Sequence, residues 1–279
     1  MVRNEYAEAV KANVEEILGE GYGVRIDVVD KGNGVKLTGV TIKEGEQNIS
    51  PTIYIDSFEK NGKTAVEAAD EVVSVYKRSG RINVDANDII ALLNDEERLL
   101  SVVQPRLMGA GQSDGYIKYP VLDLEMLFYV IVNEGKDGSR ATITLKKGCT
   151  SVDPKKLFDA ALKNMETTCR SMEEILGPIF MADDCNMIVI GNKANNFGAA
   201  GMLNTSVLDE LAEQFDDDVV ILPSSIHEVI CVPAEMCEGN PMVWMVRDIN
   251  ATQLAPNEIL SNNVYIYRRN TKSVEIKEA

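Results

Sequence analysis

Hydrophobic positions in the first 80 residues follow the helical period at both ends and the strand period between them. Tyr6, Val10 and Val14 recur at four-residue steps within the segment 4–18, which predicts an amphipathic helix. The segments that follow predict, in order, strands at 24–29, 35–42 and 51–56 and a helix at 64–77. We therefore predict an N-terminal α-β-β-β-α module over residues 1–80.

Strands in the remaining residues, 81–279, come in pairs around short turns. The expected pairs are 121–132 with 141–145, 219–222 with 226–232, and 264–267 with 273–276. Helices are expected at 154–168, 203–215 and 241–253, and the apolar segment 99–108 favours a strand. Hairpins in place of βαβ units predict the α+β class, with an antiparallel, hairpin-rich sheet in a larger domain over 81–279.

The net charge of the chain limits the kinds of molecule that it is expected to bind. Acidic residues outnumber basic ones by 44 to 28, which gives a formal net charge of −16. Proteins that bind nucleic acid directly need clustered Lys and Arg, so we expect neither direct nucleic-acid binding nor attraction to an anionic membrane surface. An acidic surface that mimics nucleic acid is the alternative, although the acids are spread along the chain.

Two further features concern the compartment. The longest apolar run, 126–132, is too short to cross a bilayer, and the first residues lack the apolar core of a secretory signal. The five cysteines are scattered without a Cys-x-x-Cys pair, which indicates neither a disulfide framework nor a zinc site. We expect reduced thiols, no cofactor, no membrane association and a cytoplasmic location.

The tripeptide Gly62-Lys63-Thr64 resembles the end of a phosphate-binding loop, between a predicted strand and a predicted helix. Such a loop needs glycine where this chain has Ser57, and Glu59 would repel phosphate. The residues fit a capping box better, with Thr64 and Glu67 exchanging hydrogen bonds at the start of the helix.

Ser225, His227 and Glu228 contain the ingredients of a hydrolase triad, including the only histidine of the chain. In a strand, however, Ser225 and His227 would point to one face and Glu228 to the other. A triad would then need an orienting acid from elsewhere. The alternative is that Ser225 belongs to a hairpin turn and that His227 is a partly buried, hydrogen-bonded strand residue.

Two acidic clusters, Asp183-Asp184 and Asp216–Asp218, could in principle hold a divalent cation. Neither has the spacing of a calcium-binding loop, and both are typical of turns. We therefore expect no metal site.

In the predicted helix 241–253, the buried face is expected to carry Met242, Met245, Val246 and Ile249. Arg247, Asn250 and Gln253 then form a neighbouring polar stripe, which makes them candidate binding residues. This stripe is either solvated or packed toward the hairpin at 223–228, with Arg247 paired to Glu228 or a nearby Asp.

Three segments carry a resemblance: Val219–Ile230 with its Leu-Pro-Ser-Ser-Ile-His-Glu-Val sequence, Met245–Ser261 with Asn-Ala-Thr-Gln, and Val264–Tyr267. They resemble an uncharacterised bacterial family, common in clostridia of the gut and known only as a domain of unknown function. The resemblance covers most of the chain but not the glycine-rich loop at 109–119. It implies no activity, substrate or cofactor.

No intact catalytic motif emerges from the residues, so we expect a non-catalytic, cytoplasmic accessory protein that binds another protein. The alternative is a hydrolase-type enzyme centred on Ser225, His227 and Glu228.

Overall fold

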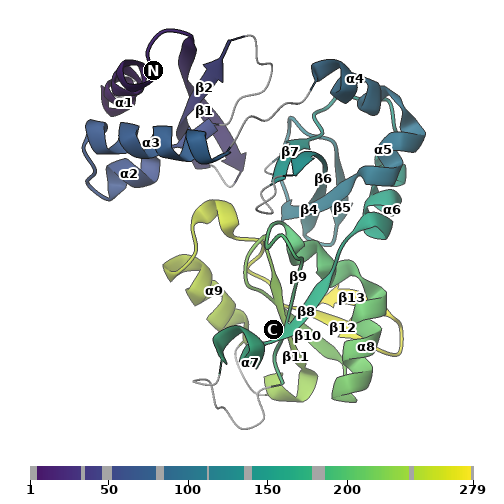
Figure 1. The fold of residues 1–279 in the computed structure, drawn as a ribbon. Helices are drawn as coiled ribbons and strands as arrows, with labels where there is room; N and C mark the ends of the chain where they lie inside the picture. The colour runs from purple at the N-terminus through teal and green to yellow at the C-terminus, as the bar shows by residue number, and fades with distance from the viewer. Residues whose placement is uncertain are drawn as a thin grey trace. The chain divides into compact units, whose positions relative to one another are not determined.

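The chain divides into two compact units in a computed structural model (Figure 1). The first unit comprises Met1–Leu93 and Val132–Thr142, and the second comprises Asn94–Ile131 and Ile143–Ala279. The structure describes residues 5–32, 35–45, 52–79, 85–111, 113–134, 140–177, 186–238 and 242–277. Of the turns predicted at 31–34 and 135–138, residues 33–34 and 135–138 lie outside these ranges.

The first unit contains the predicted α-β-β-β-α order. Its elements are α1 (Glu5–Leu18), β1 (Tyr22–Gly32), β2 (Val35–Glu44), β3 (Thr52–Tyr54), α2 (Asp56–Lys60), α3 (Ala65–Ser79) and α4 (Ala86–Asn94). The strands form an antiparallel sheet in the order β1-β2-β3. The short helix α2 is an addition to the predicted order.

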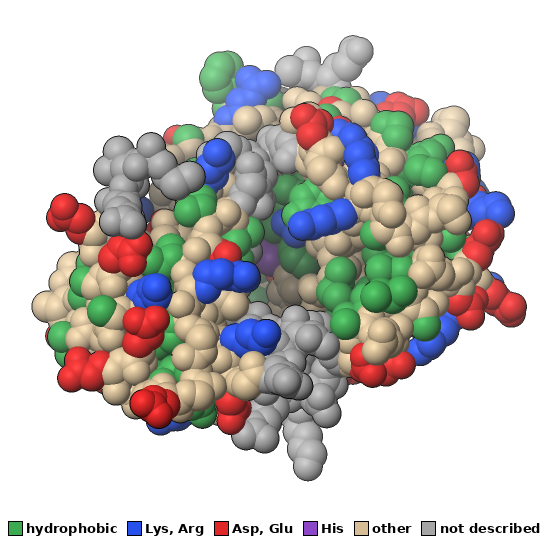
Figure 2. Space-filling model, turned by 90° about the horizontal axis from the view of Figure 1, so that it is seen from above, with side chains coloured by type: hydrophobic (Ala, Val, Ile, Leu, Met, Phe, Trp, Pro, Cys, Tyr) green, Lys and Arg blue, Asp and Glu red, His purple; other side chains and the backbone are tan. Residues whose placement is uncertain are grey.

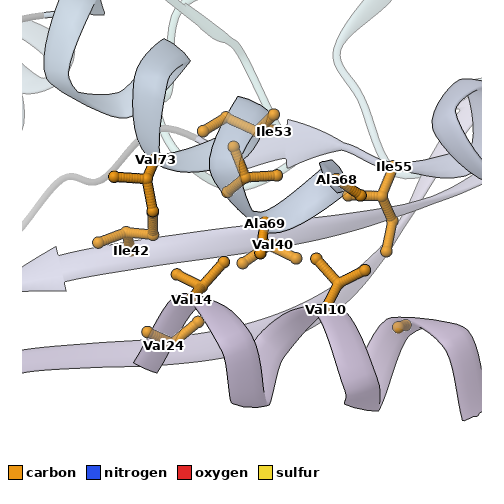
Figure 3. Packing of buried hydrophobic residues seen from close by; sticks show 12 residues of the cluster. Val10, Val14, Val24, Val40, Ile42, Ile53, Ile55, Ala68, Ala69 and Val73 are labelled. Carbon is orange, nitrogen blue, oxygen red and sulfur yellow. The ribbon is translucent and has the colours of Figure 1, made fainter. Parts of the chain in front are cut away.

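Both long helices of this unit pack on one face of the sheet (Figure 3). Val10 and Val14 of α1 share one buried cluster with Ala69 of α3 and with Val40 and Ile42 of β2. The other face carries polar contacts: there the Thr41 hydroxyl donates to Asp27 at 2.6 Å. Burying each Val or Ile stabilises the fold by about 1.5–3 kcal/mol, so this one-sided cluster is the core of the unit.

The capping box at the start of α3 is confirmed. The backbone N–H of Thr64 donates to Glu67 Oε2 at 2.8 Å, and the N–H of Glu67 donates to the Thr64 hydroxyl at 3.3 Å. Lys63, the remaining residue of interest here, forms an ion pair with Glu71. The Gly62-Lys63-Thr64 segment thus begins a helix in the way the capping interpretation predicts.

The second unit contains two antiparallel sheets, as the α+β class predicts. Its elements up to residue 191 are α5 (Glu96–Val102), β4 (Gln104–Gly109), β5 (Lys118–Val121), β6 (Leu124–Glu134), β7 (Arg140–Thr144), α6 (Pro154–Asn164), β8 (Thr168–Ser171), α7 (Met172–Leu176) and β9 (Ile188–Gly191). Beyond these lie η2 (Gly198–Leu203), α8 (Thr205–Phe215), β10 (Val219–Pro223), β11 (Val229–Pro233), η3 (Ala234–Cys237), α9 (Met242–Thr252), η4 (Pro256–Glu258), β12 (Tyr265–Arg268) and β13 (Ser273–Ile276). Strands β6 and β7 continue across the boundary between the two units.

The larger sheet has the order β13-β12-β10-β11-β9-β8, and the smaller joins β4, β6 and β5, with β7 paired to β6. All five residues of the central strand β10 are buried. Val220 and Leu222 pack with Met242 and Val246 of α9 on one face. Strand alternation turns Val219 and Ile221 to the other face, and α8 also packs against β10 (Figure 1).

Several element boundaries differ from the sequence predictions, among them those of α5 and α6. Residues 96–102 are helical because Asp95 caps α5, accepting from the Arg98 N–H at 3.0 Å, and this cap prevails over the β-leaning composition. Helix α6 ends at Asn164, before the predicted residue 168, where strand β8 begins.

The carboxylate of Asp123, in the turn between β5 and β6, joins the two sheets of the second unit. It accepts hydrogen bonds from the Ser261 hydroxyl at 2.8 Å, Asn263 Nδ2 at 3.0 Å and the Tyr265 hydroxyl at 2.7 Å. The donors lie in or just before β12 of the larger sheet. Burial, together with Asp123 itself, raises the pKa of Tyr265, so this phenol stays a donor.

Asp123→Ala is expected to lower the free energy of unfolding by about 2–4 kcal/mol, because it leaves three side-chain donors without their acceptor. Urea denaturation of the purified protein measures this. Asp114→Ala is the matched control: its side chain is 96% exposed, and a change within about 0.5 kcal/mol is expected. Equal effects of the two substitutions would contradict the role of Asp123.

Candidate functional site

His227 lies in the connection between β10 and β11, not in a strand. Strand β11 begins at Val229, so the prediction that a strand runs from Ile226 is wrong. The Ser225 N–H donates to the Glu228 carbonyl at 3.1 Å, and the Ser225 hydroxyl accepts from the His227 N–H at 3.0 Å. Short polar side chains close turns in this way, so the Ser225 hydroxyl is engaged by the backbone of its own loop.

The imidazole of His227 is held from one side by Phe197. Its Nδ1 accepts the Phe197 N–H at 3.2 Å, and the two rings stack with centroids 5.7 Å apart and planes 18° apart. Because Nδ1 is an acceptor, neutral His227 carries its proton on Nε2. Burial lowers the pKa of His227, with Arg106 acting in the same direction and Glu258 and Glu228 acting against it.

Ser225, His227 and Glu228 therefore share a loop without forming a proton relay. Within the described part of the chain, no hydrogen bond joins the three side chains, since Ser225 and His227 Nδ1 each bind backbone N–H groups. A general base must lie within hydrogen-bond reach of the proton that it removes. A catalytic role for these residues gains no support from this geometry.

Phe197 occupies its position because the loop before it is tightly folded. Asn192 Nδ2 donates to the Asn196 carbonyl at 2.7 Å, and Asn192 Oδ1 accepts the Asn196 N–H at 3.1 Å. Phe197 itself has a φ of 58°, in the left-handed region. At Gly198, a Cβ atom would lie 2.7 Å from the carbonyl oxygen of His227 and from two other backbone atoms, so only glycine fits.

Arg106, on strand β4, was not predicted from the sequence. Its guanidinium carbon lies 4.3 Å from the centroid of the Phe197 ring, whose edge-on neighbour is Tyr129 at 5.6 Å. Arg106 and His227 thus contact one aromatic ring (the Arg106–Phe197–His227 cluster). The one available signal was a lone cation within the apolar segment 99–108.

The charge of Arg106 has no acidic partner among the described residues. Its buried Nε has no hydrogen-bond partner there, and burial lowers the pKa of the guanidinium. Removing an unpaired ion from water is costly, and a cation–π contact returns only about 0.5–2 kcal/mol. The positive charge of Arg106, which is half-buried, is therefore only partly compensated within the cluster.

The candidate residues of α9 do not form one stripe. Asn250 is 4% exposed, and its Nδ2 donates to the Ser261 carbonyl at 2.9 Å and to Asn262 Oδ1 at 2.8 Å. Gln253 is exposed, and Arg247 is exposed with its guanidinium carbon 5.8 Å from the Trp244 ring centroid. Arg247 and Gln253 thus agree with the solvated alternative, and Arg247 contacts Trp244 and not Glu228.

The buried face of α9 also differs from the prediction. Met242 and Val246 are buried as expected, but Met245 is 43% exposed and Ile249 is 42% exposed, so their predicted burial is wrong. The helix is rotated because Asn250, four residues after Val246, fills a buried polar position. Trp244, the only tryptophan of the chain, is 69% exposed beside them.

The structure describes one of the two acidic clusters, Asp216–Asp218. Asp183 and Asp184 lie outside the described residues. Asp216 ends α8 and pairs with Arg269 at 2.9 Å, and Asp218 pairs with Arg268 at 3.0 Å. Where the structure describes the chain, it shows no group of three or more His, Cys, Asp or Glu side chains suited to a metal ion.

A family model matches residues 3–269. The chain belongs to DUF5688, a family of unknown function. No curated protein and no solved structure matches this DUF5688 chain significantly. Within the described residues, no helix is long and apolar enough to cross a membrane.

Gly198→Ala is expected to lower the free energy of unfolding by about 1–3 kcal/mol, because the new Cβ would collide with backbone atoms. Urea denaturation measures the effect. Gly115→Ala serves as the control, since a Cβ there meets no atom within 4 Å and its φ is not in the left-handed region. A Gly198 variant as stable as the Gly115 variant would show that the loop at 192–198 packs less tightly than described.

Proposed function

We propose that this DUF5688 protein is a non-catalytic, cytoplasmic accessory protein of bacteria that binds a partner protein through the exposed face of α9. The observation that carries the proposal is Trp244, which is 69% exposed although it is the only tryptophan in 279 residues. Tryptophan is enriched among the residues that dominate protein–protein binding energy.

Trp244 is one of three exposed apolar side chains of α9. The other two, Met245 and Ile249, are four residues apart and lie side by side on the helix. Arg247 lies over the indole ring, which restricts its rotamers before a partner arrives. Less ordering entropy is then lost on binding, as expected for a pre-organised contact residue.

The chemistry of the partner follows from the charges around this surface. Asp248 is exposed on the same face, and the chain carries a formal charge of −16. A partner with an apolar patch bordered by Lys or Arg would satisfy both features. On the face shown in Figure 2, acidic and basic side chains are interspersed, which favours a protein partner over a surface that mimics nucleic acid.

The single tryptophan makes the proposal directly measurable. The emission of Trp244 is expected to lie close to that of the unfolded chain and to be quenched efficiently by acrylamide, because the indole is exposed. Addition of the partner, purified after capture from the native host, should shift the emission to shorter wavelength and protect Trp244 from acrylamide. Protection that grows with protein concentration alone would identify a second copy as the occupant and contradict the proposal.

Trp244→Ala is expected to weaken binding of that partner by about 2 kcal/mol or more, roughly thirtyfold in Kd, as measured by titration calorimetry. Ile90→Ala, on the exposed side of α4, is the matched control and should leave the affinity unchanged. Loss of binding in both variants, or in neither, would contradict the assignment of α9. Ester hydrolysis abolished by Ser225→Ala would instead favour the hydrolase alternative.

A further inference from the structure

We propose that Arg106 binds an oxyanion, the carboxylate or phosphate group of a small ligand, at the Arg106–Phe197–His227 cluster. The inference does not depend on α9 or on the proposed partner. It rests on an arginine that contacts the Phe197 ring and lacks an anionic partner among the described residues.

The missing partner is notable because the chain is rich in acids. It has 44 Asp and Glu residues, and several cations of the second unit pair with them: Lys118 pairs with Glu125 at 2.7 Å and Arg268 with Asp218 at 3.0 Å. Glu228 and Glu258 act electrostatically on His227, but neither forms an ion pair with Arg106 in the structure. A guanidinium that stays unpaired in such a chain is available to an external anion.

The contact with Phe197 leaves the hydrogen-bonding capacity of Arg106 unused. The guanidinium carbon lies 4.3 Å from the centroid of the Phe197 ring, and this ring is no hydrogen-bond acceptor of the carboxylate kind. Guanidinium N–H groups bind carboxylate and phosphate oxygens in a bidentate manner. Among the described residues, the buried Nε of Arg106 has no hydrogen-bond partner.

Phe197, which contacts the guanidinium, is itself held in place by its loop. The Phe197 N–H is bonded to His227, and the loop is closed by Asn192 and by the close packing at Gly198. Binding sites reach high affinity when the recognising group is held by such secondary contacts. His227 is half-buried, so part of its side chain is exposed to solvent.

His227 gives a direct readout, because it is the only histidine and yields a single set of imidazole signals in proton NMR. Acetate and phosphate are titrated separately into the full-length protein, with chloride at matched ionic strength as the reference. We expect one of the two oxyanions to shift the His227 signals saturably. Neutralising Arg106 should also raise the pKa of His227, since Arg106 acts to lower it.

Arg106→Gln is expected to weaken the oxyanion response by roughly tenfold to a hundredfold, as hydrogen bonds to a charged group would predict. Arg98→Gln removes the same charge from the exposed surface of α5 and should leave the response unchanged. If Arg106→Gln fails to fold, Arg106→Lys is tested in its place. This variant keeps the charge but cannot form the bidentate contact, so it should bind the oxyanion more weakly than the wild type.

Saturation by acetate alone assigns a carboxylate ligand, and saturation by phosphate alone assigns a phosphorylated one. The proposal is overturned if neither oxyanion shifts His227 beyond the chloride reference. It is equally overturned if the wild type and a folded Arg106 variant respond with the same half-saturation.

Discussion

Asp123 accepts three side-chain hydrogen bonds from the segment that leads into β12, and the arrangement of the second unit depends on this carboxylate. One sheet is built from β4 to β7 and the other from β8 to β13, so the backbone ladders hold each sheet but not the pair. A carboxylate in a tight turn can accept several bonds at once because it has two oxygens and no donor of its own. Leu122, with a φ of 54°, produces the turn that presents it.

The Arg106–Phe197–His227 cluster crosses the same junction. Arg106 belongs to the smaller sheet, while Phe197 and His227 lie in loops that leave β9 and β10 of the larger one. The three side chains of the cluster therefore meet only when the two sheets are correctly positioned against each other. The hydrogen bonds to Asp123 and the Arg106–Phe197–His227 cluster thus both depend on the relative position of the two sheets, although they have no residue in common.

Sequence patterns predicted the parts of this fold that depend on local periodicity. The hairpin at β12 and β13 and the helices around Val10 and Ala69 follow from side-chain alternation, and Thr64 with Glu67 follows from capping chemistry. The prediction failed where tertiary contacts decide. Nothing in the spacing of α9 indicates that Asn250, in place of Ile249, would be buried against Ser261 and Asn262.

The candidate site was predictable only in part, for the same reason. His227 stood out as a unique residue, and its partly buried, hydrogen-bonded state follows from the alternative considered beside the triad. Arg106 and Phe197 are distant from His227 in sequence. No sequence pattern indicates that the backbone of Phe197 adopts a left-handed conformation. Contacts of this kind arise from how β4 and the loop at 192–198 meet, which periodicity does not encode.

The edge strand of the sheet in the first unit carries paired charges. Strand β1 is an edge of the order β1-β2-β3, and edge strands offer free backbone groups to neighbouring chains. Arg25 and Asp27 of β1 form an ion pair at 2.9 Å on the face away from the helices, and Asp27 is also tied to Thr41. A strand from another chain that paired with β1 would have to accommodate or desolvate these charges. The ion pair on β1 therefore opposes fibril-like growth of the sheet.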